Sequence, residues 1–543
     1  MQTVYVRSFR LIKKVNFTAK FRFMKILLTV LTLLTSAFCI AQTQVYEDFW
    51  DDDQSVAKSK GEFINGFEYG EWTYWFPNGN IQEVSEFYKG KLDGAVKRYY
   101  QNGKLRHNGF FSEGLQDSIQ QSYYNNGQIM EQGLYNNGVR IDKWEYFRKD
   151  GKPLMVEQFE LGKEKLVSYW DHEGQQTVVE GNGVKLELFN NSKSKVKTTY
   201  KAGLIDGEIT KWFATGIKQA QGYLKENIEN GQWQYWYDNG QLEKTVVYDN
   251  GLLEGPIEEY YRDGKLSIKG VFKAGAKEGE WTWKLANDLT DMIGQFKADI
   301  QHGHWQYFDS EGILEFEGDY AEGFKEGEWK YYYADGNWLK KGNFSQNKKT
   351  GMWQYWHANG NKAQEGTFVD DKEDGSWESW YETGKQKDQG NFKAGQLNGL
   401  WTGWYDNGVK HYEGSWTNNA KSGNWTTWYP NEKVKETGAH KEGEKTGTWV
   451  TNNEYGTTTA TGTYLEDQMD GKWTFLYPNG SPLRTQAYKN GVLNGKSITY
   501  HNNGNMEVEC TYKTGKLDGA WKRFDKKGQV QLEKKFDNGK TVE

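Results

Sequence analysis

Cysteine and proline are both scarce: the 543 residues include two cysteines and six prolines. Cys39 lies in an N-terminal segment that we expect to be cleaved, so Cys510 would be left alone and no intramolecular disulfide is expected. Proline removes a backbone donor, and its rarity is typical of strands that lie inside a sheet. The fold must therefore be stabilised by packing.

Motifs that carry catalysis or cofactor binding are also absent. The chain has no Gly-Lys-Ser/Thr phosphate loop, no Gly-x-Ser-x-Gly and no His-Glu-x-x-His. His302 and His304 flank Gly303 and are either a weak metal pair or two surface histidines beside a turn. We predict no enzymatic activity, no catalytic residue, no cofactor and no metal.

Acidic residues are missing from the first 25 positions, which hold seven basic ones, and an apolar run follows from Ile26 to Ile40. A basic flank, a short apolar core and an exit at Ala41 are typical of a secretory signal peptide, and the run is too short and threonine-rich for a membrane span. We predict a signal peptide over 1–41, with 1–23 a spurious extension. The mature protein would be periplasmic, extracellular or on the cell surface. A lipoprotein signal at Cys39 is the alternative, but Phe38 stands where that signal needs a small residue.

The deficit of basic residues grows once this segment is removed. Cleavage would take away seven of the 68 basic residues and none of the 74 acidic ones, leaving 61 against 74. This negative balance argues against nucleic acid and against an anionic membrane surface as partners.

Glycine, in contrast, recurs at a fixed interval of 24 residues. One repeat is Gly351-Met-Trp-Gln-Tyr-Trp-His-Ala-Asn-Gly360, and its first glycine defines slot zero. A fixed period of this length is the signature of a repeat array. Slot zero is glycine at positions 207, 231, 255, 279, 303, 327, 351, 375, 399, 423, 447, 471, 495 and 519, and the same spacing joins Gly70, Gly94, Ser118 and Asp142.

Each repeat has the pattern strand, turn, strand, turn. Bulky residues alternate at slots two and four, as in Trp329 and Tyr331, which is a β-period. Slots eight and nine often are Asn-Gly, as in Asn359-Gly360, which predicts a type I′ turn with positive φ at both residues. Slot twenty is Gly, Asn or Asp, which tolerate a left-handed backbone. We predict an all-β fold, an elongated single-layer array of about twenty stacked 24-residue β-hairpin repeats.

Two slots would form aromatic columns. Tryptophan fills slot two in 13 of the 19 in-register repeats, and we expect this column to be the core. Slot five points to the opposite face and is filled less strictly. We predict that its four successive tryptophans bind a ligand or partner, with a half-buried packing column as the alternative. These candidate binding residues are Trp356, Trp380, Trp404 and Trp428.

The phrase Gly-x-Trp-x-x-Trp/Tyr-Tyr-x-Asn-Gly, followed by Glu-Gly-x-Phe/Tyr and a closing glycine, resembles the bacterial variant of the MORN repeat. The resemblance covers the chain from about Gly61 to its end. It implies stacked β-hairpin repeats, and it implies an antitoxin-like role because this repeat type is found in antitoxin components of toxin–antitoxin modules. A toxin neutralised by an exported protein would itself have to be secreted.

The period also divides the chain. Residues 42–60 lack turn residues and are expected to be a linker or cap, and 61–174 form a first MORN-like repeat block. Asp142 and Gly183 are 41 residues apart, so the period breaks here. We therefore expect an irregular, shortened and degenerate region over 175–206 and a second, strictly periodic block over 207–543.

Two functions fit these features. The first is an exported non-enzymatic scaffold that binds a protein partner along its extended β-surface, possibly as an antitoxin. The alternative is a glycan-binding or cell-surface protein that uses exposed Trp and Tyr ladders. Long bare ladders would favour a glycan, and patches interrupted by charge would favour a protein. Lysines near the last strand oppose edge pairing, so we expect a monomer or a weak end-to-end dimer.

Overall fold

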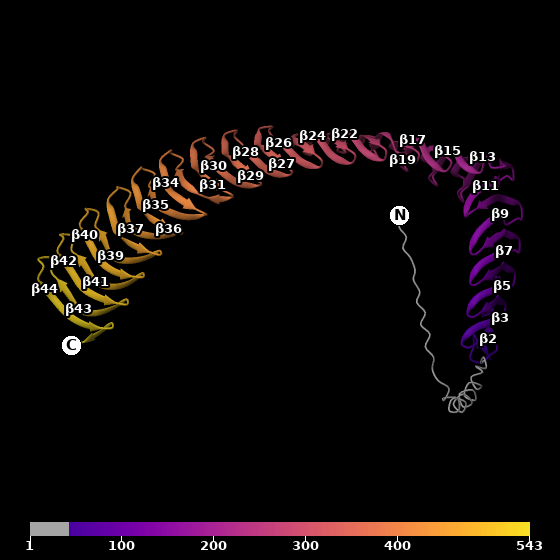
Figure 1. Cartoon of the computed structure of the whole chain (residues 1–543), viewed down its shortest axis with the longest axis horizontal. Helices are drawn as coiled ribbons and strands as arrows, with labels where there is room; N and C mark the ends of the chain where they lie inside the picture. Colours follow the sequence, from indigo (N-terminus) through magenta and orange to yellow (C-terminus); the bar gives the residue numbers. More distant parts are fainter. Residues whose placement is uncertain (1–42, 543) are drawn as a thin grey trace, which may run out of the picture. The chain divides into compact units, whose positions relative to one another are not determined.

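The computed structural model describes residues 43–542, so the expected signal peptide over 1–41 and the alternative at Cys39 lie outside the described residues. The described chain forms 45 strands in one antiparallel sheet, and the predicted all-β array of stacked hairpins is confirmed. Successive strands follow one another in chain order (Figure 1). No helix in 43–542 has the length and apolarity needed to cross a bilayer.

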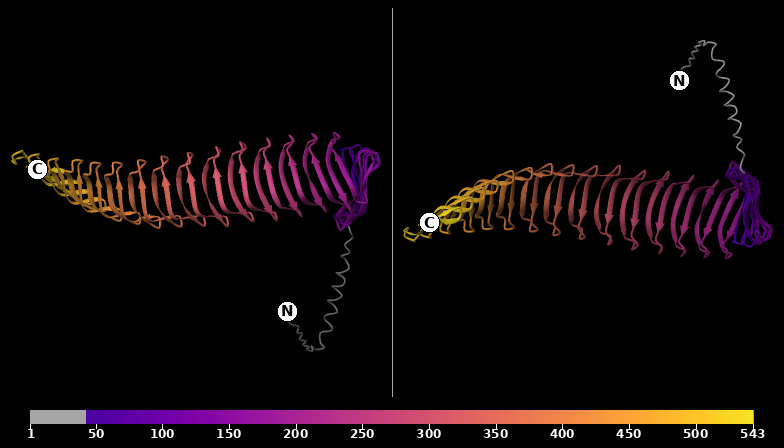
Figure 2. Two further views of the ribbon diagram at one scale, coloured as in Figure 1. Left: turned by 90° about the horizontal axis from the view of Figure 1, so that it is seen from above. Right: turned by 90° about the horizontal axis from the view of Figure 1, so that it is seen from below.

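Two compact units divide the chain. The first contains the residues up to Thr210 together with Leu224–Asn227, and the second contains Lys211–Tyr223 and the residues from Ile228 onward. In the second unit the strands lie side by side, with hairpin turns along both edges (Figure 2).

The strands of the first unit, together with β15 and β16 at the division, are β1 (Thr43–Phe49), β2 (Ala57–Ile64), β3 (Phe67–Trp75), β4 (Ile81–Tyr88), β5 (Lys91–Tyr99), β6 (Leu105–Ser112), β7 (Leu115–Tyr123), β8 (Ile129–Asn136), β9 (Val139–Phe147), β10 (Pro153–Glu160), β11 (Lys163–Trp170), β12 (Gln176–Val179), β13 (Asn182–Leu188), β14 (Ser194–Lys201), β15 (Leu204–Trp212) and β16 (Lys218–Lys225). Those of the second unit are β17 (Ile228–Trp236), β18 (Leu242–Asp249), β19 (Leu252–Leu253), β20 (Gly255–Tyr260), β21 (Leu266–Lys273), β22 (Ala276–Lys284), β23 (Thr290–Lys297), β24 (Ile300–Phe308), β25 (Leu314–Ala321), β26 (Phe324–Tyr332), β27 (Trp338–Ser345), β28 (Lys348–Trp356), β29 (Lys362–Val369), β30 (Lys372–Trp380), β31 (Gln386–Lys393), β32 (Gln396–Leu397), β33 (Gly399–Trp404), β34 (Lys410–Thr417), β35 (Ala420–Trp428), β36 (Val434–Lys441), β37 (Glu444–Asn452), β38 (Thr458–Leu465), β39 (Gln468–Leu476), β40 (Pro482–Lys489), β41 (Val492–Tyr500), β42 (Met506–Lys513), β43 (Lys516–Phe524), β44 (Val530–Asp537) and β45 (Lys540–Val542).

The first turn of each repeat differs from the prediction, and the type I′ assignment for Asn-Gly is wrong. Gly360 has a φ of 85°, but Asn359 is not among the residues with positive φ. The Gly360 N–H donates to the His357 carbonyl at 2.9 Å, and the His357 N–H donates to Asn361 at 2.8 Å. This pattern is a type I turn closed by a left-handed glycine, the common three-residue hairpin loop.

Asparagine at slot eight is used for its side chain and not for its backbone freedom. Asn359 Oδ1 accepts the Asn361 N–H at 3.0 Å, and Asn359 Nδ2 donates to the Glu382 carbonyl of the next repeat at 2.7 Å. The asparagine therefore ties neighbouring hairpins together. The second turn is the one with two left-handed residues, as at Asn418 and Asn419 with φ of 49° and 68°.

A bulge at slot zero explains the recurring glycine. Across β27 and β28, Asn343 pairs with Thr350 while Gly342 pairs with Trp353, so Gly351 and Met352 have no partner on that side. Gly351 takes a φ of 62° to accommodate these extra residues. Because two residues are inserted, the alternation of faces is preserved, and slots twenty-two and two point to one face, which we call the core face.

Slot-two tryptophans form the core, as predicted. Trp329 and Trp353 are fully buried. Each indole lies directly on the slot-fifteen glycine of the preceding hairpin, where a Cβ on Gly342 would stand 2.2 Å from Trp353. Trp353 Nε1 also donates to the Asn343 carbonyl at 3.1 Å. The glycine at slot fifteen is therefore a steric requirement of the next tryptophan.

Slot-seventeen aromatics and slot-twenty-two lysines complete this core. Trp353 packs edge-on between Phe344 and Phe368, with ring centroids 5.1 and 6.1 Å away. The Lys349 ammonium lies 4.7 Å from the Trp353 ring. A row of cation–π contacts thus covers the buried indoles, with the lysine heads at the surface.

The segment expected as a linker or cap contains a terminal strand. Residues 43–49 form β1, which pairs with β2. The carboxylate of Asp51 accepts the backbone N–H groups of Ser55 and Val56 at 2.8 and 3.1 Å, so this acid closes the loop between the two strands.

Candidate functional site

The four predicted tryptophans lie on the face opposite the core face, one at the end of each of β28, β30, β33 and β35. All four are half-buried. Their backbone carbonyls accept hydrogen bonds from the slot-six side chains of the preceding repeats, from Tyr333, His357, Tyr381 and Tyr405, at 2.9, 3.0, 2.7 and 2.8 Å. These bonds hold each tryptophan in line with the next repeat. We call this set the slot-five column.

Other side chains interrupt the slot-five column. The Trp356 ring packs edge-on against Trp338, 5.1 Å away, and the two border a shallow hollow of about 270 Å³. Lysine ammonium groups lie over two further rings, Lys362 at 5.3 Å from Trp380 and Lys410 at 5.7 Å from Trp428. The column is therefore a chain of aromatic patches separated by charge.

Exposed apolar residues also occur on this face. Trp338 is 40% exposed, Met352 49% and Leu400 55%. Met352 and Leu400 occupy slot one of two repeats that contribute to the column. These residues lie on the same face as the slot-five column, and polar side chains such as Gln354 and Glu365, which are hydrogen-bonded to each other at 3.0 Å, separate them from it.

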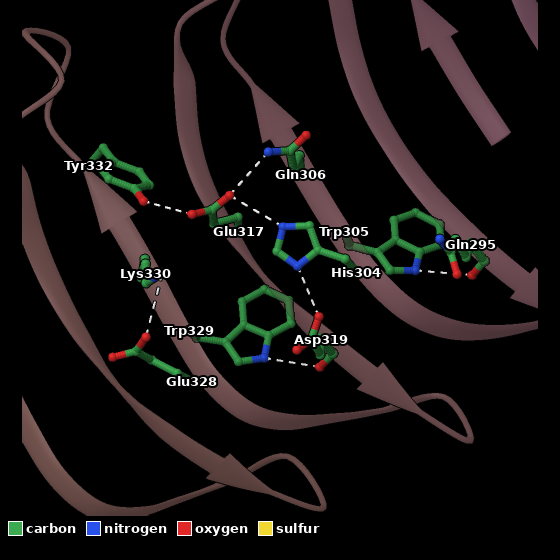
Figure 3. Close-up of polar contacts among 10 residues, drawn as sticks. All are labelled: Gln295, His304, Trp305, Gln306, Glu317, Asp319, Glu328, Trp329, Lys330 and Tyr332. Carbon is green, nitrogen blue, oxygen red and sulfur yellow. Dashed lines mark hydrogen bonds and ion pairs between the residues drawn. The ribbon is translucent and has the colours of Figure 1, made fainter. Parts of the chain in front are cut away.

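A network of polar side chains lies on the same face, in the repeats that come before the slot-five column in the sequence (Figure 3). His304 lies between two carboxylates, with Nδ1 2.9 Å from Asp319 and Nε2 3.3 Å from Glu317. Glu317 also accepts from Gln306 at 3.1 Å and from the Tyr332 hydroxyl at 2.8 Å. Tyr332 is itself the slot-five residue of its repeat, so the aromatic and polar parts of this face are joined.

Opposing effects set the pKa of Glu317. Burial raises it, but hydrogen bonds from Gln306, Tyr332 and His304 outweigh burial and hold the pKa below its ordinary value of 4.5. The same burial, with the Glu317 carboxylate beside it, raises the pKa of Tyr332. The network is therefore built around an ionised Glu317.

We expect Glu317 to stabilise this part of the sheet only above acidic pH. A depressed folded-state pKa contributes stability that is present above the unfolded value and lost as pH falls through the folded one. Glu317→Gln should destabilise by about 2 kcal/mol at pH 7, the usual worth of hydrogen bonds to a charged group, and by progressively less as the pH falls below 4.5 through the folded-state pKa. Thermal melts of wild type and variant from pH 3 to 8 test this, and a difference independent of pH would contradict it.

The two histidines considered as a metal pair have separate environments. His304 belongs to the carboxylate network, whereas His302 is exposed and lies across from Gln295 in the neighbouring strand. Within residues 43–542 no group of three or more His, Cys, Asp or Glu side chains is arranged to hold a metal ion.

A second aromatic row on the core face was not anticipated. Residues at slot four of one strand lie beside residues at slot thirteen of the next. Three aromatic rings in these slots stack. The ring centroids of Tyr307 and Phe316 are 4.4 Å apart, and those of Phe316 and Tyr331 are 5.6 Å apart. These rings are half-buried, with one side against the core tryptophans. The period places bulky residues at slot four, but their stacking on slot thirteen depends on the cross-strand register, which the period does not give.

The repeat type follows from a comparison with protein families. Eleven segments match the family described as MORN repeat variant, namely residues 68–89, 92–112, 116–137, 229–250, 253–274, 301–322, 325–346, 349–370, 469–490, 493–514 and 517–538. These eleven repeats are MORN repeat variants. Three of them lie in the first unit and eight in the second.

Comparisons with whole proteins add little. No curated protein matches the sequence. Among solved structures, the chain is 10% identical to "Crystal Structure of TcdB2-TccC3-Cdc42", covering 91% of this chain and 31% of that one with a TM-score of 0.12. It is also 10% identical to "Crystal Structure of TcdB2-TccC3 without hypervariable C-terminal region", covering 94% and 32% with a TM-score of 0.13. The chain spans about a third of those chains, and TM-scores this low carry no argument.

Proposed function

We propose that the MORN repeats form an exported, non-enzymatic scaffold that binds a protein partner on the face opposite the core, centred on the slot-five column. The observation that carries this proposal is the mixture of aromatic, apolar and positively charged side chains on that face. Half-buried tryptophans alternate with lysine ammonium groups, and exposed Met352 and Leu400 lie on the same face, four residues before a tryptophan of their own strands. Aromatic residues and methionine are enriched at the centres of protein interfaces, with charge at the rim.

Charge between the rings favours a protein over a glycan at this face. A glycan that stacks along several rings needs them bare, whereas Lys362 and Lys410 lie over two of the four tryptophans. The signal-like segment over 1–41 supports export of the scaffold. The resemblance to antitoxin repeats supports a toxin as the partner, and that toxin would have to be exported too.

Replacing Trp380 and Trp404 together by alanine tests the proposal. Truncating hot-spot tryptophans typically costs about 2 kcal/mol or more each, so partner binding should fall by well over tenfold. The melting temperature should change little, because the slot-two core is untouched. Tyr455→Ala is the matched control, since Tyr455 is 79% exposed in a hairpin turn away from the column.

Quantitative mass spectrometry of proteins captured from the native envelope gives the readout. The partner should be enriched by wild type and by Tyr455→Ala and lost with the double variant. If no protein shows this pattern, the slot-five column is not a binding surface. A large drop in melting temperature for the double variant would instead make the column part of the core.

A glycan-binding function is a second candidate, favoured by the stacking of Tyr307 on Phe316 on the core face. The row ends at Tyr331, where the Lys340 ammonium lies 4.4 Å from the ring. Stacked, half-buried rings are suitable for contact with sugar rings. A glycan array probed with wild type, with Phe316→Ala and with the tryptophan double variant separates the two functions. Binding lost only in Phe316→Ala supports the glycan, and binding by none excludes it.

A further inference from the structure

The break in the repeat pattern opens a pocket on the core face of the first unit. Strand β12 has only four residues, so β11 reaches beyond it, and the Leu166 N–H donates to the Gly203 carbonyl at 2.9 Å. The hollow beside this contact has a volume of about 300 Å³. Its lining residues are Glu157, Glu164, Leu166, Lys185, Tyr200, Gly203, Ile205 and Asn227.

Charged side chains occupy slots that are glycine, tryptophan or lysine elsewhere. Glu157 stands at slot fifteen and pairs with Trp144 of β9 on one side. On the other side, where the tryptophan of the following hairpin excludes a side chain in other repeats, its partner is Leu166. Lys185 stands at slot two, two residues after Gly183. Glu164 pairs with Phe159 and so stands at slot twenty-two, which holds a lysine or arginine over the tryptophan in many other repeats. The shortened repeat has thus replaced the core column by a polar pocket.

The cations around the two pocket carboxylates form ion pairs with other acids. Lys165 pairs with Glu160, and Lys185, which lines the pocket, pairs with Glu187, each at 3.0 Å. Arg140, which also acts on Glu157, pairs with Glu131 at 3.3 Å. Within residues 43–542 neither Glu157 nor Glu164 forms an ion pair.

Burial and neighbouring carboxylates disfavour additional negative charge in the pocket. Glu157 accepts a hydrogen bond from the Tyr146 hydroxyl at 2.8 Å. Burial raises the pKa of Glu157 and the carboxylate of Glu164 adds to this, against the opposing effects of the Tyr146 hydrogen bond, Lys185 and Arg140. Burial and three nearby carboxylates, those of Glu187, Glu157 and Glu164, raise the pKa of Tyr200 to about 12. A cation placed here would relieve this repulsion.

We propose that this pocket binds an alkylammonium group. The two unpaired carboxylates of Glu157 and Glu164 would accept its N–H groups, and Leu166, Ile205 and the Tyr200 ring would contact its methylenes. Charge-assisted hydrogen bonds in a half-buried site are stronger than neutral ones, and an aromatic ring adds to the attraction of a cation. The group could belong to a free diamine or to a lysine side chain of another protein. This site is independent of the slot-five column, which lies on the other face and in the other unit.

Isothermal titration of the full mature chain with three probes tests the proposal. The probes are 1,5-diaminopentane, N-acetyl-lysine amide and, as a neutral control, pentanol. We expect one site for an amine and none for pentanol. Binding of the diamine alone identifies a free amine as the ligand, whereas binding of the lysine derivative identifies a side chain.

Variants locate the site. Glu157→Gln should weaken amine binding roughly tenfold, the value of one charge-assisted hydrogen bond. Glu280→Gln, on the opposite face of the second unit, should bind as wild type does. Should Glu157→Gln alter the melting curve, Glu164→Gln provides the same test because Glu164 is exposed. Amine binding no stronger than that of pentanol, or unchanged in both pocket variants, would overturn the proposal.

Discussion

Gly366→Val should locally unfold the hairpin formed by β29 and β30. A Cβ on Gly366 would stand 2.1 Å from Trp377, far inside van der Waals contact. Trp377 cannot move away easily, because it is buried, packs edge-on against Phe368 and Phe392, and donates from Nε1 to the Thr367 carbonyl at 3.2 Å. Overpacking of this kind typically costs about 1–3 kcal/mol, and a clash with a rigid indole belongs at the upper end.

Another pair of repeats in this chain shows which substitution of the tryptophan should compensate for Gly366→Val. Val246 and Ile257 occupy the same two slots in an earlier pair of repeats, and both are buried. Trp377→Ile should therefore rescue Gly366→Val, so that the double variant is more stable than the valine variant alone. A double-mutant cycle should give a favourable coupling of about 2 kcal/mol.

Native-state hydrogen exchange is the suitable readout, because long repeat arrays do not unfold in one step. Amide protection over 362–380 should collapse in the valine variant and return in the double variant. Peptides from 506–524 serve as an internal control. Additive effects of the two substitutions would show that the indole and the glycine are not sterically linked.

Deleting exactly one repeat should leave a folded protein, and deleting half a repeat should not. Removal of 375–398 joins Asp374 to Gly399, so Gly366 then lies under Trp401 in place of Trp377. Every slot keeps its neighbour types, and nearest-neighbour stability predicts only a small loss. The melting curve should therefore remain close to that of wild type.

Removal of 375–386 instead places two second strands in succession. The core would lose a tryptophan and the slot-zero bulge together, and burial of a tryptophan alone is worth about 3–5 kcal/mol. Circular dichroism melts of the two deletions should differ strongly, with early and less cooperative unfolding in the 12-residue deletion. Equal melting curves would contradict the 24-residue unit.

Strand order and the core column could be predicted from sequence because both depend on the period alone. Once slot two is tryptophan in most repeats, stacking places residues such as Trp329 and Trp353 in one buried line. The left-handed second turn followed from residue type for the same reason, as at Asn419. Sequence patterns within one repeat are therefore sufficient to predict a feature wherever a residue type has a single structural role.

Features that depend on contact between repeats could not be predicted in this way. The Asn-Gly turn was misassigned because Asn359 is retained for a hydrogen bond to the next repeat, which no local signal reveals. Nothing within a single repeat indicates that Gly342 lies beneath Trp353. The pocket around Glu157 likewise arises from a missing tryptophan in the neighbouring strand. The polar network of His304 combines two repeats.

Site-specific photo-crosslinking tests the central claim, that the face opposite the core binds a protein, most directly. A photoreactive residue is introduced at Met352, at Leu400 or at Gln364, which is exposed on the core face. Crosslinking is then carried out in the native envelope with the full chain. The proposal predicts that the same partner is captured from positions 352 and 400 and not from 364. Capture from position 364 alone, or equally from all three, would contradict it.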